Sequence, residues 1–211
     1  MNRRYEAVLF DLLTALLDSW TLWNAVAGSE EAGRAWRAAY LRNTYGTGAY
    51  QPYERLVAEA AAEVGLSPSL GNVLAERYGE LRPWPEVSAV LGALRRHVRL
   101  AVVTNCSETL AAKAVACTGI DFDVVVSAER AGFYKPDPAP YRLAVGELNL
   151  APQNCLFVAG SSYDLFGTAA VGLPTFWHDR IGMVPPHGAS PPLAHCRSLD
   201  ALPAFVLGRA R

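Results

Sequence analysis

Short apolar runs that end in polar residues or glycine recur along this chain. Most of these runs are continuous, not alternating, and contain β-branched residues. Such runs are typical of strands in a parallel sheet that helices cover on both faces. The sequence therefore predicts five strands, at residues 5–10, 99–103, 123–126, 155–158 and 174–177.

Patterns of helical period separate these runs in the second half of the chain. The alternation of strand and helix from about residue 98 onward is typical of an α/β fold with a doubly wound, Rossmann-like parallel sheet. The Pro-rich stretch at 182–196 predicts a surface loop, followed by a short final segment. The predicted helices of this part lie at residues 87–96, 107–118, 138–148 and 164–171.

The stretch between the first and second strands has a different pattern. Three amphipathic segments, EEAGRAWRAAYLRNTYG, YERLVAEAAAEVGL and LGNVLAERYGEL, follow one another with no strand between them. The segment LRPWPEV, with its two prolines, is typical of a linker that returns to the sheet. We therefore predict a helical cap over residues 18–83, inserted after the first strand of a core formed by residues 1–17 and 84–211.

The composition limits which classes of molecule the protein is expected to bind. The chain has 211 residues, of which 51% are hydrophobic and 18% are charged, and its net charge is −1. This balance predicts a globular protein and argues against nucleic acid as a partner. No apolar stretch reaches the roughly 20 residues of a membrane span, and the N-terminal segment has no apolar leader, so we expect a cytoplasmic protein. The four cysteines show neither zinc-ligand nor disulfide spacing.

Polar residues gather where the carboxyl ends of the predicted strands meet. Asp11 ends the first strand, and Thr104 and Asn105 end the second. A loop carries Lys135, and the polar segment 161–164 follows the fourth strand. Ligands of doubly wound sheets sit beyond this edge, so these separate segments predict a single site.

In this order, the four clusters resemble the motifs of the haloacid dehalogenase superfamily of hydrolases. The matching segments are VLFD, LAVVTN, FYKPDPAPY and LFVAGSSYDLFG, and the resemblance covers nearly the whole chain. It implies that Asp11 is a nucleophile whose carboxylate forms an ester that water later hydrolyses. It also implies that Lys135 keeps Asp11 ionised, and that Ser161 and Asp164 position or activate the water.

The resemblance also implies which residues contact the substrate. Thr104, counted with the catalytic residues, and Asn105 can donate hydrogen bonds to a bound anion. The segment WRAAYL resembles the cap segment whose arginine lines the site, which is Arg37 here. The other expected substrate contacts are Leu12, Leu13, Tyr50, Tyr141 and Trp177.

Leu13 separates two reactions of this superfamily. Most members are magnesium-dependent phosphatases with a second Asp two residues after the nucleophile, which protonates the leaving group. Leu13 stands at that position, and Gly160 or Ser161 stands where the first metal-binding acid of the fourth motif is expected. Magnesium prefers several oxygen ligands, carboxylates prominent among them. The L-2-haloacid dehalogenase branch lacks both features, because displacing a halide from carbon requires neither a leaving-group proton nor a metal.

Two motifs depart from that branch. The usual D-x-Y-G-T at the nucleophile is D-L-L-T-A here, so Thr14 comes one place early and Ala15 stands where the hydroxyl is expected. In the fourth motif, Ser161 replaces Asn and Ala159 replaces Ser. These changes affect the groups that place the hydrolytic water, so the displacement step is better preserved than the hydrolysis step.

We therefore expect metal-independent, cofactor-free hydrolysis of small L-2-haloalkanoic acids through an aspartyl ester. The alternatives are a divergent hydrolase of this superfamily acting on another small carboxylate or on a phosphate ester, and a non-catalytic member that binds a small anion or a protein. The expected partner is a small-molecule substrate, with neither nucleic acid nor membrane. Similar proteins are often homodimers, and the sequence leaves that assembly open.

Overall fold

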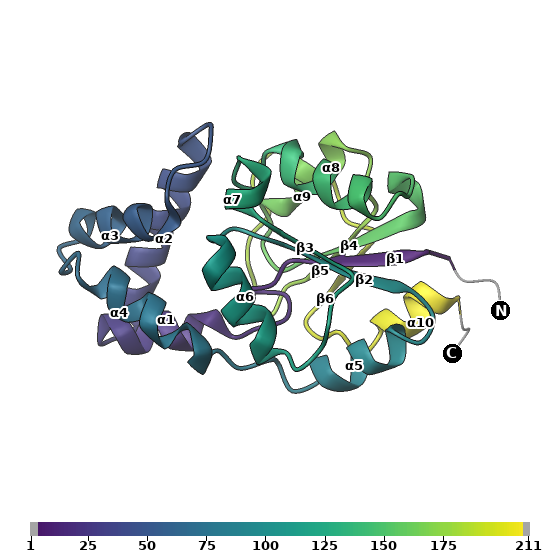
Figure 1. Ribbon diagram of the computed structural model, residues 1–211, viewed down its shortest axis with the longest axis horizontal. Coiled ribbons are helices and arrows are strands. Elements are labelled where there is room, and N and C mark those ends of the chain that lie inside the picture. Colours follow the sequence, from purple (N-terminus) through teal and green to yellow (C-terminus); the bar gives the residue numbers. More distant parts are fainter. Residues whose placement is uncertain (1–3, 209–211) are drawn as a thin grey trace.

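Six parallel strands form a single sheet at the centre of the computed structural model, which describes residues 4–208. Their order across the sheet is β3-β2-β1-β4-β5-β6, with β1 and β4 in the middle (Figure 1). Because β1 pairs with both β2 and β4, the chain reverses its winding direction at β1, where doubly wound sheets bind ligands. The strands are β1 (Ala7–Phe10), β2 (Arg99–Thr104), β3 (Val124–Ser127), β4 (Cys155–Ala159), β5 (Thr175–His178) and β6 (Ala194–Cys196).

Helices cover both faces of this sheet. Helices α7, α8 and α9 lie on one face, and α5, α6 and α10 lie on the other (Figure 1). The two-sided cover explains why the inner strand segments are continuously apolar, since the side chains of β1, β4 and β5 are buried on both faces of the sheet. The bounds are α5 (Val87–Leu94), α6 (Glu108–Cys117), α7 (Ala128–Ala131), α8 (Pro138–Glu147), α9 (Asp164–Ala170) and α10 (Leu202–Leu207), with the 3₁₀ helix η2 (Pro152–Asn154) before β4.

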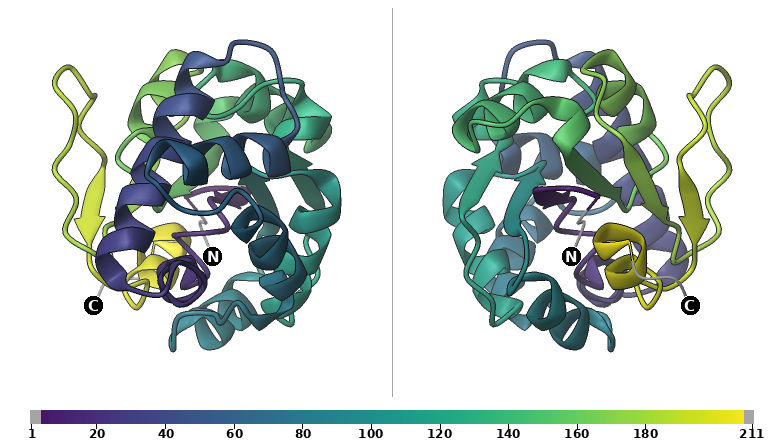
Figure 2. Two further views of the ribbon diagram at one scale, coloured as in Figure 1. Left: turned by 90° about the vertical axis from the view of Figure 1, so that its left-hand side faces the viewer. Right: turned by 90° about the vertical axis from the view of Figure 1, so that its right-hand side faces the viewer.

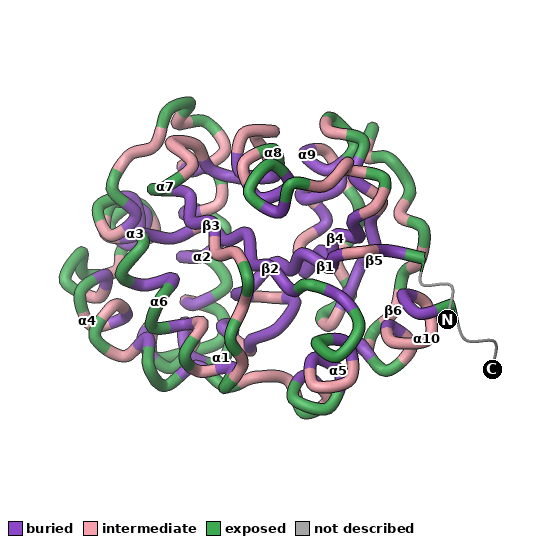
Figure 3. The backbone as a smooth tube through the Cα atoms, turned by 45° about the vertical axis from the view of Figure 1, so that its right-hand side comes forward, coloured by how far each residue is buried: buried purple, intermediate pink, exposed green. Residues whose placement is uncertain are grey.

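Alternate side chains along β1 enter two separate cores. Leu9 packs with Phe157 and Tyr141 on the α8 side, while Phe10 joins the larger cluster on the other side. Strands β1 and β4 are buried along their whole length, and β2 is buried from Leu100 onward (Figure 3). Asp11, which directly follows β1, is therefore carried on the most rigid part of the fold.

Four helices and a 3₁₀ turn form the cap between β1 and α5. Aromatic side chains fill its interior: Trp36 packs against Trp23 with ring centroids 4.7 Å apart, and its indole Nε1 donates to the Val57 carbonyl at 2.8 Å. The hydroxyls of Tyr53 and Tyr78 pair at 2.9 Å. These elements are α1 (Ser19–Ala27), α2 (Glu30–Gly46), α3 (Tyr53–Glu63), α4 (Leu70–Glu76) and η1 (Arg77–Glu80).

The two connections between cap and core run side by side. Leu17 and Pro83 form an antiparallel bridge, and the Asp18 amide donates to the Arg82 carbonyl at 2.8 Å. A second cap–core junction lies at the tip of the cap, where the Tyr134 hydroxyl donates to the Gln51 carbonyl at 2.8 Å. The cap is thus held at both ends over the carboxyl edge of the sheet.

The predicted α/β class and the five predicted strands are confirmed. The expectation of a loop throughout 182–196 is wrong at its end, where β6 pairs with β5. The segment before β6 forms a long loop that projects from one side of the molecule (Figure 2). Helices α1, α7 and α10 were not predicted; α7 has only four residues and α10 only six, too few to show a helical period. The cap limits at residues 18 and 83 stay a prediction. The outermost residues of the predicted core, 1–3 and 209–211, lie outside the described residues.

Within the described part of the chain, no helix is long and apolar enough to cross a membrane.

Replacement of Leu9 by Ala should strongly destabilise the protein. Leu9 is fully buried between β1 and α8, so the substitution removes buried methyl groups and leaves a cavity, at a cost of about 2–5 kcal/mol. Urea unfolding followed by circular dichroism measures the free energy of unfolding. Leu193→Ala, at a leucine that is 53% exposed, is the matched control and should change it by less than about 0.5 kcal/mol.

Candidate active site

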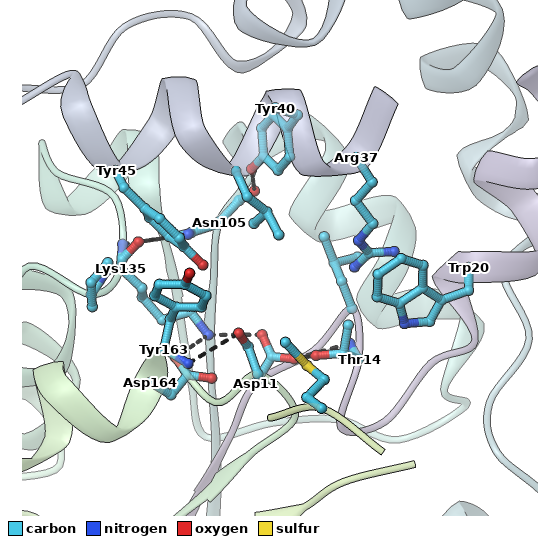
Figure 4. Close-up of a pocket in the computed structure, with 15 residues that line it drawn as sticks. Asp11, Thr14, Trp20, Arg37, Tyr40, Tyr45, Asn105, Lys135, Tyr163 and Asp164 are labelled. Atoms are coloured by element: carbon cyan, nitrogen blue, oxygen red, sulfur yellow. Dashed lines mark hydrogen bonds and ion pairs between the residues drawn. The ribbon is translucent and has the colours of Figure 1, made fainter. Parts of the chain in front are cut away.

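A cavity of about 60 Å³ lies between the carboxyl edge of the sheet and the cap (Figure 4). Its floor comes from the segments that follow β1, β2 and β4 and from the loop after α7, and its roof comes from α1 and α2. The core residues that line it are Asp11, Leu13, Thr14, Asn105, Lys135, Pro136, Ser161, Tyr163, Asp164 and Met183, and the cap residues are Trp20, Arg37, Tyr40, Leu41 and Tyr45.

Asp11 is held by a hydrogen-bond donor at each carboxylate oxygen. Its Oδ2 accepts from the Thr14 amide at 2.9 Å, the Thr14 hydroxyl at 2.5 Å and the Ala15 amide at 3.1 Å. Among the described residues, its Oδ1 accepts only from Lys135 Nζ, at 2.7 Å. The carboxylate is therefore fixed in orientation, with Oδ1 the less encumbered oxygen.

Lys135 lies between two carboxylates. Its Nζ is 2.7 Å from Asp11 Oδ1 and 3.0 Å from Asp164 Oδ1 (Figure 4). The Asn105 side chain clamps the backbone of this lysine: its Oδ1 accepts from the Lys135 amide at 2.7 Å, and its Nδ2 donates to the Lys135 carbonyl at 2.9 Å. The amide of Asn105 thus positions the lysine, whereas the sequence predicted a contact with a bound anion.

Burial and opposite charge compete at these three residues. Burial alone would raise the pKa of Asp11, but the Lys135 charge and the hydrogen bonds lower that pKa below its ordinary value. Burial opposes the Lys135 ammonium, yet the two carboxylates raise the pKa of Lys135. At Asp164 burial is the strongest influence, and it keeps the pKa of that carboxyl raised despite the nearby lysine. Asp11 is therefore the stronger acid of the pair, and Asp164 the better proton acceptor.

Asp164 begins α9 and presents one occupied and one unoccupied oxygen. Its Oδ1 accepts from the Tyr141 hydroxyl at 2.7 Å as well as from Lys135. Its Oδ2 is buried and has no hydrogen-bond partner among the described residues. Leaving a buried carboxylate oxygen unpaired is costly, so this atom marks a place for a polar group or water.

Arg37 brings a positive charge to the opposite wall. Its guanidinium lies 4.0 Å from the Trp20 ring centroid, and its Nη1 donates to the Ser19 hydroxyl at 2.7 Å. Burial lowers the pKa of Arg37. A buried guanidinium has five N–H donors, and Ser19 takes only one of the bonds described here, so the remaining donors suit an anion in the cavity.

Aromatic side chains close the rim between cap and core. Tyr45 of α2 packs against Tyr163 with ring centroids 4.5 Å apart and the ring planes tilted by 35°. The Tyr40 hydroxyl donates to the Asn105 carbonyl at 2.9 Å. Met183 reaches the cavity from the loop after β5, where its amide donates to Asp179 Oδ1 at 2.7 Å. The rim is apolar, so it excludes bulk water from the charged floor.

Three of the predicted site residues are buried beside the cavity and do not line it. Thr104 is fully buried, and its hydroxyl faces Cys106 Sγ at 3.6 Å, so it is not aimed at a bound anion. Tyr141 contacts Asp164 and Phe157 beneath the floor. Leu12 points into the core.

Tyr50 and Trp177, also predicted to contact substrate, lie outside the cavity. Tyr50 stacks on Tyr134 at 5.3 Å, and its hydroxyl accepts from the Tyr53 amide at the tip of the cap. Trp177 enters the smaller core and stacks on His195 at 4.1 Å. Strand periodicity explains Trp177: its neighbours along β5 point to the other face, so a motif match alone misassigned its direction.

The sequence did not identify several residues that line the cavity. Trp20, Tyr45 and Met183 come from segments that match none of the motifs described above. The helical spacing of Arg37, Leu41 and Tyr45 on one face of α2 is the signal that places them together.

The acidic residues here do not suit a divalent cation. Within the described residues no group of three or more His, Cys, Asp and Glu side chains could hold a metal ion. Asp11 and Asp164 are the two acids that line the cavity, and the Lys135 ammonium already bridges their Oδ1 atoms.

Replacement of Lys135 by Met should destabilise the protein most at neutral pH. Two buried carboxylates would lose their counter-charge, which costs about 3–5 kcal/mol. Because that loss raises the folded-state pKa of both acids, the penalty should shrink as pH falls toward 4, where the acids can be protonated. Chemical unfolding at pH 7 and pH 4.5 measures both values. Lys113→Met, at the chain's only other lysine, is the control and should change stability by less than about 0.5 kcal/mol at either pH; a loss at Lys135 that did not depend on pH would contradict the charge assignment.

Known proteins of similar sequence include dehalogenases that match most of the chain and a phosphoserine phosphatase of Thermus thermophilus that is 31% identical over 60% of it. A family model described as haloacid dehalogenase-like hydrolase matches residues 5–172. Haloacetate dehalogenase H-2 of Moraxella sp. (strain B) is 29% identical, covering 85% of this chain and 88% of that protein. (S)-2-haloacid dehalogenase 1 of Pseudomonas sp. (strain CBS-3) is 28% identical, covering 96% of each chain.

Solved structures agree in fold. The crystal structure of an L-2-haloacid dehalogenase superposes with a TM-score of 0.85 at 28% identity, covering 96% of this chain and 98% of the other. The family model spans most of the chain, including the segments that carry Asp11, Lys135 and Asp164. This protein therefore belongs to the haloacid dehalogenase-like hydrolase family.

Proposed function

We propose that this protein hydrolyses short L-2-haloalkanoic acids to 2-hydroxy acids, without a metal, through an ester on Asp11. The observation that carries the proposal is a buried Asp11 ion-paired with Lys135 and followed, two positions later, by Leu13 in the place of a proton donor. Such a site can attack carbon but has no group to protonate an alkoxide leaving from phosphate. The relatives named haloacetate and (S)-2-haloacid dehalogenases support the same reaction.

The first step is displacement at carbon. Asp11 Oδ1 attacks the carbon that bears the halogen, a C–O bond forms, and the halide leaves with the electron pair of the C–X bond. Arg37, facing Asp11 across the cavity, supplies the charge that binds the substrate carboxylate or the departing halide. The apolar rim removes water from Asp11 Oδ1, which makes the carboxylate a stronger nucleophile.

The second step is hydrolysis of the ester. Water attacks Cγ of Asp11 while Asp164 Oδ2, the unpaired oxygen, takes its proton. The bond between Cγ and the ester oxygen then breaks, and that oxygen leaves in the 2-hydroxy acid with the proton returned by Asp164. Loss of one further proton restores the Asp11 carboxylate. Ser161, at the cavity wall beside Asp164, is suited to hold the water.

The proposal of metal independence rests on the floor of the cavity. Lys135 already neutralises Asp11 and Asp164, and Oδ2 of Asp11 is saturated by three donors. A cation would have to displace the ammonium, and it would find glycine and serine at positions 160 and 161 instead of a further acid.

The size of the cavity favours very short acids. Its volume of about 60 Å³ holds only a few water molecules, since each needs at least about 10–15 Å³. Leu41 and Trp20 close the side toward the cap. A two- or three-carbon halo acid matches this space, and a longer alkyl chain meets the cap helices.

Halide release tests the reaction directly. Wild-type protein should release chloride from L-2-chloropropionate equally well with and without a metal chelator, measured with a halide electrode. Asp11→Asn should lower the rate by more than about 10³-fold, because an amide is a poor nucleophile. Phosphate release from small phosphate esters is the contrasting assay. The proposal fails if wild type releases no halide from any short halo acid, or if the chelator abolishes the release.

Chain-length selectivity tests the cavity wall. Leu41→Ala should raise kcat/KM for 2-chlorobutanoate relative to chloroacetate by about 10-fold, because it opens space for added methylene groups. Leu70→Ala, in the cap helix α4 and away from the cavity, is the matched control and should leave the ratio unchanged. An unchanged ratio in both variants would remove Leu41 from the wall that limits chain length.

A further inference from the structure

The peptide unit between Thr14 and Ala15 is bonded on both of its polar sides. Its N–H, from Ala15, donates to Asp11 Oδ2 at 3.1 Å. Its C=O, from Thr14, accepts from the indole Nε1 of Trp84 at 3.0 Å. We propose that Trp84, in the linker that returns from the cap, is a positioning residue for Asp11 and acts through this one peptide. The inference deepens the reaction proposed above.

Trp84 and His178 together form hydrogen bonds with three successive carbonyls of the turn after Asp11. The backbone amide of Trp84 donates to the Leu16 carbonyl at 3.0 Å. His178 Nδ1 lies 2.9 Å from the Ala15 carbonyl, and since a carbonyl only accepts, Nδ1 carries the proton. The other ring nitrogen, Nε2, lies 3.7 Å from Glu86 Oε1. The turn is thus tied to the linker and to β5.

Trp84 is itself fixed in place. The prolines at 83 and 85 restrict the backbone on either side of it. The Arg180 guanidinium lies 4.8 Å from its ring centroid and pairs with Glu86 at 3.0 Å. A side chain held by stacking and by a stiff backbone gives its hydrogen bond at little further cost in conformational entropy.

Gly160 closes the other side of the turn. A Cβ built on Gly160 would lie 2.2 Å from Thr14 Oγ1 and 2.3 Å from the Ala15 nitrogen, so β4 and the turn are in direct backbone contact. The Thr14–Ala15 peptide therefore sits between the end of β4 and the indole of Trp84. Loss of the indole N–H removes a constraint that no other side chain described here supplies to that carbonyl.

This peptide faces the oxygen on which charge develops during hydrolysis. When Asp11 Oδ1 bonds to the substrate carbon, Oδ2 becomes the ester carbonyl oxygen. Attack of water on Cγ then pushes the carbonyl electron pair onto Oδ2, where the Ala15 and Thr14 amides and the Thr14 hydroxyl donate. Preorganised donors of this kind stabilise an oxyanion, and the bond from Trp84 polarises the Ala15 amide toward it. Trp84 should thus assist hydrolysis more than displacement.

Trp84→Phe tests this assignment, because phenylalanine keeps a ring for Arg180 and loses only the indole donor. With L-2-chloropropionate, rapid-quench measurements should show the first halide burst within about 3-fold of wild type and ester hydrolysis slowed by about 10-fold, a modest effect beside the loss of a direct oxyanion donor. The ester-bearing protein should accumulate in intact mass spectra. Both kcat and KM should fall, with kcat/KM nearly unchanged.

Trp36→Phe is the matched control. It removes the same kind of bond, from an indole to a backbone carbonyl, inside the cap and away from the cavity. Its burst and hydrolysis rates should keep the wild-type ratio. Equal slowing of both steps in Trp84→Phe, or the same change in Trp36→Phe, would overturn the positioning role.

A second measurement requires no turnover. Amide hydrogen exchange of Ala15, followed by nuclear magnetic resonance, should be at least about 10-fold faster in Trp84→Phe and unchanged in Trp36→Phe, with the amides of β1 protected equally in both. Unchanged exchange at Ala15 would overturn the proposal. If wild type released no halide but Ala15 exchange changed as expected, the proposed reaction would fail while the positioning of Asp11 by Trp84 would stand.

Discussion

The ion pairs of Lys135 are the constraint on which the rest of this site depends. A lone carboxylate in a buried cleft would be protonated or would destabilise the fold. One ammonium shared by Asp11 and Asp164 makes both acids tolerable. It leaves them unequal, because Asp11 Oδ2 accepts three further hydrogen bonds, whereas Asp164 Oδ2 accepts none among the described residues. In the proposed reaction, a nucleophile and a proton acceptor thus arise from the same residue type through their surroundings. The two hydrogen bonds from Asn105 to the Lys135 backbone, and the position of Asp11 at the end of β1, fix the arrangement of these three charged groups.

Much of this arrangement was predictable from sequence, for identifiable reasons. The strands before Asp11 and Asp164 are continuous apolar runs, and parallel topology requires their carboxyl ends to meet, so the charged floor followed from the pattern. The aromatic rim did not, because Trp20 and Tyr45 owe their positions to the way the cap packs on the core. Helical spacing groups Tyr45 with Arg37 on one face of α2, but long-range packing decides which part of the core that face meets. The direction of Trp177 was missed for a simpler reason: a one-residue change of register turns a strand side chain to the opposite face.

The turn after Asp11 illustrates how a motif can change and keep its hydrogen bonds to the carboxylate. Thr14 stands one place earlier than in the usual motif, yet its hydroxyl and two consecutive amides still reach Asp11 Oδ2. The altered position is accommodated by neighbours from distant segments, Gly160 and Trp84 among them. A departure in a motif is therefore weak evidence for lost activity until the surrounding backbone is known.

The paired linkers at Leu17 and Pro83 have an evolutionary consequence. The chain leaves and re-enters the core at adjacent points. The cap therefore constrains the strands of the sheet no more than a short loop between the same two points would. Any folded insert whose two ends lie equally close together can occupy this insertion point without disturbing the register of the strands. The same core can then be combined with different caps. Selection can change the accepted substrate by exchanging the cap while the residues of the core keep their positions.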